Sequence, residues 1–155
     1  MSSFKTKLIM EPLDDGELWR LAEPFVYHLG IEGSGVEISV PLDFITDLTS
    51  VPWGFRWIIP AWGKYGKAAV LHDYLYFVGI YDRVVCDAIF VEAMHTLGVS
   101  WIVRGLIYKA VRYFGWVPWI AHRKRMPAKS EMGAAIANQE VSPHIAGIVK
   151  VTKSK

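Results

Sequence analysis

A run of nine residues, 68–76, constrains this chain most, because it is an apolar helical segment with an imidazole and a carboxylate at its centre. His72 and Asp73 are adjacent there, between Leu71 and Tyr74. An ionisable pair inside a hydrophobic helix destabilises the fold unless each group has a partner. The pair therefore belongs either to a buried hydrogen-bond network or to a functional site.

Length and charge indicate one domain followed by a tail. A chain of 155 residues can bury a sizeable core. Aromatic residues make up 14% and include seven Trp, which favours a dense core or an apolar surface meant for a partner. Residues 1–121 carry ten Lys/Arg and thirteen Asp/Glu, a net charge of −3, whereas residues 122–155 carry seven and two, a net charge of +5. We predict a compact domain over 1–121 and a basic, small-residue-rich, extended tail over 122–155. A weakly acidic body is not typical of a specific nucleic-acid-binding domain.

Cysteine content and hydropathy exclude several other classes. The single cysteine, Cys86, excludes an internal disulfide and any cysteine-based zinc site. The first residues lack the apolar run of a secretory signal. The most apolar stretch, residues 99–120, is interrupted by Arg104, Lys109 and Arg112. We therefore expect neither a signal peptide nor a transmembrane helix.

The hydrophobic pattern predicts an α+β fold, with a small N-terminal antiparallel sheet packed on a bundle of about three helices. Apolar side chains alternate with polar ones at 25–29 and 36–40, on either side of a glycine-rich turn, and a shorter strand precedes them at 17–21. Helices are expected at 67–77, at 83–97 after an Asp82 cap, and at 100–114.

Two segments leave alternatives open. In the third helix Ile102, Leu106, Val111 and Phe114 lie mostly on one side. That helix is either a core helix with a solvated basic edge or a basic amphipathic surface that binds anionic lipid. The aromatic residues 53–62 form a pocket wall, a membrane-contacting surface or part of the core.

The expected helical hairpin places Asp87 opposite His72. Its turn centres near residue 80, so the two residues lie about eight and about seven positions from it, a mismatch of about 1.5 Å. An aspartate that orients an imidazole leaves the other ring nitrogen available to take a proton from water.

Asp73 points about 100° away round the helix and is available for a cation or for a partner from the loop around Asp47. Asp47 alternatively caps the following helix together with Thr49 and Ser50. A structural role is the simpler interpretation of His28 and His95. Zinc bound by His72, Asp73 and a second histidine would have no diagnostic spacing.

Several motifs occur in an order that resembles an uncharacterised phage and prophage family, the domain of unknown function one-three-five-three, over roughly residues 20–116. They are FITDLTSVP at 44–52, HDYLY at 72–76, Arg83 with DAIF at 87–90, and VRYFG at 111–115. The resemblance implies a bacteriophage origin and supplies no established reaction. We therefore expect a virion structural protein of the tail or baseplate.

Such a protein would be made in the host bacterial cytoplasm and found in the virion. It would bind other virion proteins through the tail, with Arg123, Lys124 and Arg125 as partner-binding residues and no specific nucleic acid. Contact with the host membrane and an accessory or anti-defence role stay open.

The His-Asp-x-x-Tyr spacing of residues 72–76 is also similar to that of phospholipase A2, particularly the small prokaryotic type, as is YKAVRYFG at 108–115. This resemblance implies that His72 is a general base and that Asp87 orients it. Tyr76 takes the place of the motif tyrosine, and Asp73 would bind Ca²⁺ with help from Asp47. The alternative function is then a hydrolase of phospholipid, or of another ester or amide, used during infection. The disulfides and the glycine-rich calcium loop of those enzymes have no counterpart here, and the His-to-Asp spacing is shorter.

Overall fold

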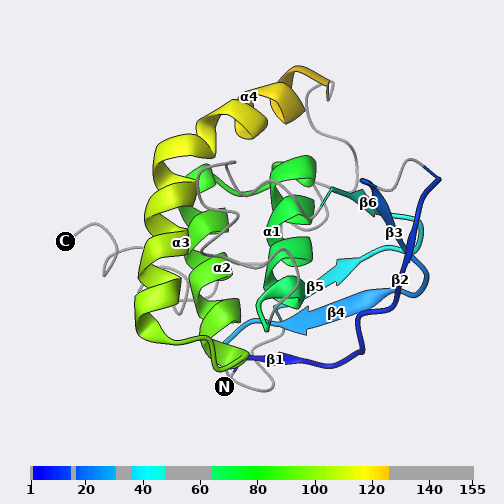
Figure 1. The fold of residues 1–155 in the computed structure, drawn as a ribbon, viewed down its shortest axis with the longest axis horizontal. Helices are drawn as coiled ribbons and strands as arrows, with labels where there is room; N and C mark the ends of the chain where they lie inside the picture. Colours follow the sequence, from blue (N-terminus) through cyan, green and yellow to red (C-terminus); the bar gives the residue numbers. More distant parts are fainter. Residues whose placement is uncertain (1, 15–16, 31–35, 48–63, 126–155) are drawn as a thin grey trace.

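The computed structural model of the chain describes residues 2–14, 17–30, 36–47 and 64–125. Within these ranges six short strands precede four helices, which confirms the predicted α+β class (Figure 1). The strands are β1 (Ser3–Phe4), β2 (Met10–Pro12), β3 (Trp19–Leu21), β4 (Phe25–His28), β5 (Glu37–Val40) and β6 (Ile45–Thr46). The helices are α1 (Gly66–Val78), α2 (Arg83–Thr96), α3 (Trp101–Phe114) and α4 (Trp116–Arg125).

The described strands form two antiparallel sheets where a single sheet was expected. One has the order β1-β4-β5 and the other the order β2-β3-β6. The predicted β4–β5 hairpin is present, with Phe25 opposite Val40 and Tyr27 opposite Ile38, and all four side chains are buried. The second sheet forms because residues 45–46, expected to be part of a loop, pair with β3 instead.

The helix ends follow local sequence signals with one exception. Gly79 ends α1 with φ of 62°, a left-handed conformation that glycine adopts without steric cost. The Ser100 side chain accepts a hydrogen bond from the Val103 N–H at the start of α3. Asp82 takes the N-cap position of α2 as predicted, but its side chain makes no capping hydrogen bond.

Helix α4 was not predicted. The last helix expected from the sequence ends at residue 114, yet a further helix begins at Trp116, with Pro118 in its first turn, where proline is tolerated. The helix continues past residue 121, so Arg123, Lys124 and Arg125 belong to a helix at the backbone level. No helix in the described part of the chain is long and apolar enough to cross a membrane.

The layers place α1 at the centre of the molecule. Figure 1 shows the strands on one side of α1, with α2 and α3 on the other. Only Ile107 and Ala110 of α3 are buried. Of the two alternatives for that helix, the core helix is wrong for the side that carries Ile102, Leu106 and Phe114, because these residues are exposed. The physical reason is that α3 is an outer helix which contacts α2 along a narrow stripe.

Several predictions fall on segments outside the described residues. They concern the turn residues 31–35, the helix cap at Thr49 and Ser50, the aromatic residues 53–62 and the tail beyond residue 125. They stay predictions.

Candidate functional site

The α1–α2 hairpin brings His72 against Asp87, as the helix geometry predicted. The His72 Nε2 atom lies 3.0 Å from Asp87 Oδ1. Asp87 is fully buried, whereas 9% of the His72 side chain is accessible to solvent. The histidine can therefore meet water while the carboxylate that orients it cannot.

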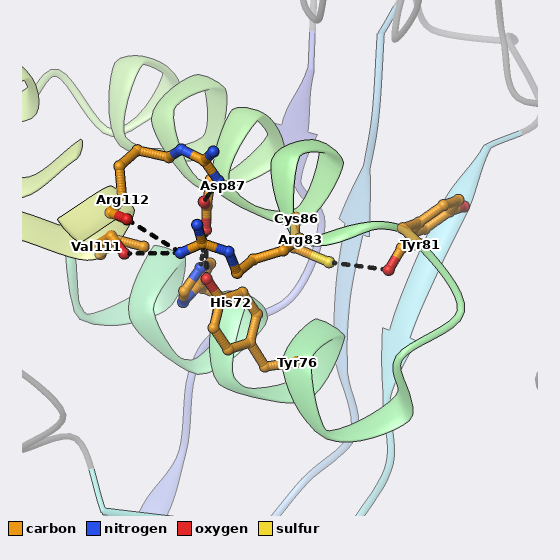
Figure 2. A network of polar contacts seen from close by, with 8 residues as sticks. All are labelled: His72, Tyr76, Tyr81, Arg83, Cys86, Asp87, Val111 and Arg112. Atoms are coloured by element: carbon orange, nitrogen blue, oxygen red, sulfur yellow. Dashed lines mark hydrogen bonds and ion pairs between the residues drawn. The ribbon is translucent and has the colours of Figure 1, made fainter. Parts of the chain in front are cut away.

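Three side chains satisfy the buried Asp87 carboxylate (Figure 2). The Tyr76 hydroxyl donates to Oδ1 at 2.6 Å, and His72 Nε2 shares the same oxygen. Arg112 Nη1 donates to Oδ2 at 2.8 Å. A buried charge is tolerated when it is paired and its oxygens accept hydrogen bonds, and both conditions hold here.

The charge state of Asp87 fixes the tautomer of His72. Burial alone would raise the pKa of Asp87, but the hydrogen bond and charge of His72, followed by Arg112 and Tyr76, lower it below its ordinary value. The carboxylate is therefore ionised at neutral pH and only accepts hydrogen bonds. His72 must then carry its proton on Nε2, which leaves Nδ1 of the neutral ring as an acceptor. Nδ1 has no hydrogen-bond partner among the described residues.

Aromatic rings fix the plane of the imidazole. Phe90 stacks on His72 with ring centroids 4.6 Å apart, and the Tyr76 ring is tilted against it at 4.1 Å. Burial, and then the charge of Asp87, raise the pKa of Tyr76 above its ordinary value. The Tyr76 hydroxyl stays protonated as a result and continues to donate to Asp87.

A second arginine holds α3 in place for Arg112. Arg83 Nη1 on α2 donates to the Arg112 carbonyl at 3.2 Å and to the Val111 carbonyl at 3.4 Å (Figure 2). These carbonyls belong to the last turn of α3, where few backbone N–H groups of the same helix remain to donate to them. Arg83 therefore ties the C-terminal end of α3 to α2 at the level where Arg112 reaches Asp87.

The α3–α4 junction closes over Tyr76, and a glycine makes this approach feasible. A Cβ at position 115 would lie 3.0 Å from the Tyr76 hydroxyl and 2.5 Å from the Val111 carbonyl oxygen. Trp119 on α4 then contacts the Tyr76 ring edge-on, with centroids 5.1 Å apart. Gly115 and α4 thus cover the tyrosine end of the network.

Asp73 faces away from this network, as its angular position predicted. Its Oδ2 accepts a hydrogen bond from the Thr46 hydroxyl on β6 at 2.5 Å. Burial is the main reason that the pKa of Asp73 is raised to about 6, and the charge of Asp47 adds to the increase. The Thr46 bond and the charge of His72 act in the opposite direction. Asp47 is therefore close enough for its charge to act on Asp73.

The described residues bring no cluster of three metal-binding side chains around Asp73. Ca²⁺ takes six to eight oxygen ligands, and Asp73 and Asp47 are two carboxylates. No group of three or more His, Cys, Asp or Glu side chains in the described ranges is arranged to hold a metal ion. The metal-binding role of Asp73 and Asp47 stays a prediction.

Other residues that the sequence raised lie apart from this site. His28 pairs with Glu37 across the β4–β5 hairpin at 2.8 Å, a structural contact. His95 is exposed near the end of α2 and, among the described residues, makes no hydrogen bond or ion pair with the network. Arg123, Lys124 and Arg125 lie at the end of α4, and their partner-binding role stays a prediction.

Sequence reasoning missed three contributors to the site: Arg112, Arg83 and Thr46. Arg112 was interpreted only as one of three interruptions of an apolar helix, and its sequence spacing does not distinguish it from Arg104 or Lys109. The available signal was its place in the VRYFG motif, and Arg83 and Thr46 likewise lie in the motifs that carried the family resemblance.

Comparison with protein families gives one result. A family model described as "Protein of unknown function (DUF1353)" matches residues 19–111. The matched range includes His72, Tyr76 and Asp87 and ends one residue before Arg112. No curated protein and no solved structure matches the chain.

Proposed function

The chain belongs to the family of proteins of unknown function (DUF1353), and for this member we propose a hydrolase in which His72 is the general base. Its substrate class is an ester or an amide, including the ester bonds of phospholipids. One observation carries the proposal: the fully buried carboxylate of Asp87 lies 3.0 Å from His72 Nε2, so that Nδ1 is the acceptor of the neutral ring.

The proposed reaction begins with proton transfer from water to His72 Nδ1. The water oxygen forms a bond to the substrate carbonyl carbon, which gives a tetrahedral intermediate. Asp87 stabilises the imidazolium that forms, because its carboxylate accepts the Nε2–H bond throughout. The intermediate collapses with cleavage of the bond to the leaving group, and Nδ1–H returns the proton to the departing oxygen or nitrogen.

Tyr76 and Arg112 are positioning residues in this scheme. Both bind Asp87, so they act on the histidine through the carboxylate. Together they hold both carboxylate oxygens, which stops the group from rotating away from the imidazole. The similarity of residues 72–76 to the His-Asp-x-x-Tyr pattern of phospholipase A2 supports the same assignment of roles.

The test compares matched histidine variants on two probes. Fatty-acid release from phosphatidylglycerol vesicles and p-nitrophenol release from p-nitrophenyl butyrate are measured with added Ca²⁺ and with a chelator. His72→Asn should lower kcat about 10²- to 10⁴-fold, the usual contribution of a general base. His95→Asn, the same change at an exposed histidine outside the network, should leave kcat unchanged. Thermal unfolding of both variants checks that the fold is retained.

Two outcomes would overturn the proposal. One is wild-type protein that hydrolyses neither probe in either buffer. The other is turnover by His72→Asn at the wild-type rate, because a contaminating or histidine-independent activity would then account for it.

The virion role expected from the sequence stays a prediction of its own. It depends on contacts of the tail with other virion proteins, and residues 126–155 lie outside the described part of the chain. Detection of the chain in purified phage particles supports that role, and its absence from them contradicts it. A virion protein can also carry a hydrolytic site, so the two functions are compatible.

A further inference from the structure

Exposed apolar side chains gather on the two outer helices. Twelve large apolar residues are exposed in the described part of the chain, and eight of them lie on α3 and α4. Trp101 and Tyr113 are the most exposed, at 76% and 73%. Scattered single exposed apolar residues need no explanation, but a contiguous group of this kind indicates a binding surface.

The spacing places several of these residues on one side of α3. Ile102, Leu106, Lys109 and Tyr113 follow each other at four, three and four residues, so they share one side of α3. Trp101 at the start of α3, and Trp116 and Val117 at the start of α4, are exposed next to the ends of this row. We call the surface formed by Trp101, Ile102, Leu106, Tyr113, Trp116 and Val117 the α3–α4 face. Figure 1 places both helices on the outside of the molecule.

The two helices that carry this face have charged residues of one sign. Residues 93–125 contain no Asp or Glu and six Lys or Arg. Lys109 is exposed within the apolar row of α3, and residues 123–125 add three basic residues at the end of α4. Arg112 is already paired with Asp87 and contributes less to the outside field. A partner that covers this face must therefore be apolar where it meets the rings and anionic around them.

A second copy of the chain does not meet this requirement. In a two-fold dimer the same patch meets itself, so the basic residues of one copy would face those of the other. No acidic residue in 93–125 is available to offset that repulsion. An anionic lipid bilayer supplies both parts of the requirement, with acyl chains for the aliphatic side chains and phosphates for the cations.

We propose that the α3–α4 face binds the interfacial region of an anionic membrane. Helix α3 lies in the plane of the interface, with Ile102 and Leu106 directed into the acyl region. Trp101, Tyr113 and Trp116 sit at the headgroup level, which tryptophan and tyrosine rings favour. The Lys109 stem lies along apolar surface while its ammonium group reaches phosphate. Binding is peripheral, in agreement with the lack of a spanning helix in the described residues.

The membrane proposal does not depend on the proposed hydrolysis. Its evidence is exposure and charge on α3 and α4, whereas the hydrolase rests on the His72 network. The α3–α4 face and the His72 network are nevertheless close in space. Helix α3 carries Arg112, which binds Asp87, and α4 carries Trp119, which contacts Tyr76.

Co-sedimentation of the full chain with vesicles tests the proposal. The chain should sediment with phosphatidylglycerol vesicles and not with phosphatidylcholine vesicles, and added salt should weaken its binding. Trp101→Ala with Tyr113→Ala should weaken binding to phosphatidylglycerol about tenfold or more, because two large interfacial rings are lost. Lys109→Glu should also weaken binding to phosphatidylglycerol vesicles, and this loss should be larger in low salt than in high salt.

A matched control removes two exposed apolar residues elsewhere. Ile9 and Leu42 are 41% and 51% exposed and lie on the strand side. The double variant Ile9→Ala, Leu42→Ala should bind the vesicles as the wild type does. Lack of binding to phosphatidylglycerol would overturn the proposal, as would equal loss in the control variant. A dimer in solution that the Trp101→Ala, Tyr113→Ala variant dissociates would also overturn it and assign the face to a second copy. These results are independent of turnover on the soluble ester, so binding and hydrolysis can fail separately.

Discussion

Replacing Asp87 by asparagine tests the network that holds His72. The two side chains are nearly the same size, but the amide offers one acceptor oxygen and one donor nitrogen where the carboxylate offers two acceptors. If the amide oxygen keeps the Tyr76 and His72 bonds, its NH₂ group faces the Arg112 donor. If the amide is flipped, the NH₂ group faces Tyr76 and His72 instead, and His72 must change tautomer to accept from it.

The expected cost follows from these contacts. Breaking a buried ion pair by removing one partner typically costs about 3–5 kcal/mol. Arg112 can turn partly to solvent, because 30% of its side chain is accessible, so we expect a loss near the lower end, about 3 kcal/mol. For a chain of this size that loss lowers the melting temperature by about 6–12 °C.

Urea unfolding at pH 7, followed by circular dichroism, measures the change. Asp82→Asn is the matched control, because Asp82 is exposed and its side chain makes no capping bond. That variant should stay within about 0.5 kcal/mol of the wild type. An Asp87→Asn variant as stable as the wild type would refute the role given to this carboxylate.

The pH dependence gives a second check on Asp87. Its pKa is lower in the folded than in the unfolded chain, so its stabilisation is present above the ordinary carboxyl pKa. The stabilisation is lost as the pH falls through the folded pKa. The stability gap between the wild type and Asp87→Asn should therefore narrow below about pH 4.

Three further substitutions test other contacts of the site. For Asp73, the folded pKa of about 6 means that stability is greatest below the unfolded pKa and falls as pH rises through 6. Between pH 5 and pH 8 the wild type should lose at most about 1.4 kcal/mol through this group, and urea titrations of Asp73→Asn should lack that loss. Tyr76→Phe removes a hydrogen bond to a charged acceptor and should cost about 1.5–3 kcal/mol in the same assay, with no loss expected for Tyr113→Phe. Gly115→Ala should cost about 1–3 kcal/mol by thermal unfolding, because its Cβ would meet the Val111 carbonyl oxygen, and an unchanged melting temperature would contradict the close approach.

The sequence predicted the elements that rest on local signals. The helices expected at 67–77, 83–97 and 100–114 begin and end within one residue of α1, α2 and α3. The contact between His72 and Asp87 was predictable because two helices joined by a short turn must run antiparallel, and the rise per residue then sets which positions meet.

Features that depend on tertiary placement were not predictable from the same signals. The apolar pattern of α3 fits a core helix and a surface helix equally well, and only its outer position decides that Ile102 and Leu106 are exposed. Arg112 reaches Asp87 because Arg83 and the α3–α4 junction fix the end of α3. The hydrophobic periodicity of the sequence gives no signal of that tertiary contact. The pairing of β6 with β3 likewise joins residues more than twenty positions apart.

The tautomer of His72 is the most direct test of the arrangement on which the proposed chemistry depends. Nitrogen-15 NMR of the His72 ring, in the wild type at a pH where the imidazole is neutral, measures which nitrogen carries the proton. The expected result is a protonated Nε2 and a bare Nδ1, with that preference lost in Asp87→Asn. A protonated Nδ1 in the wild type, or an equal mixture of tautomers, would contradict the claim that Asp87 prepares His72 to act as a base.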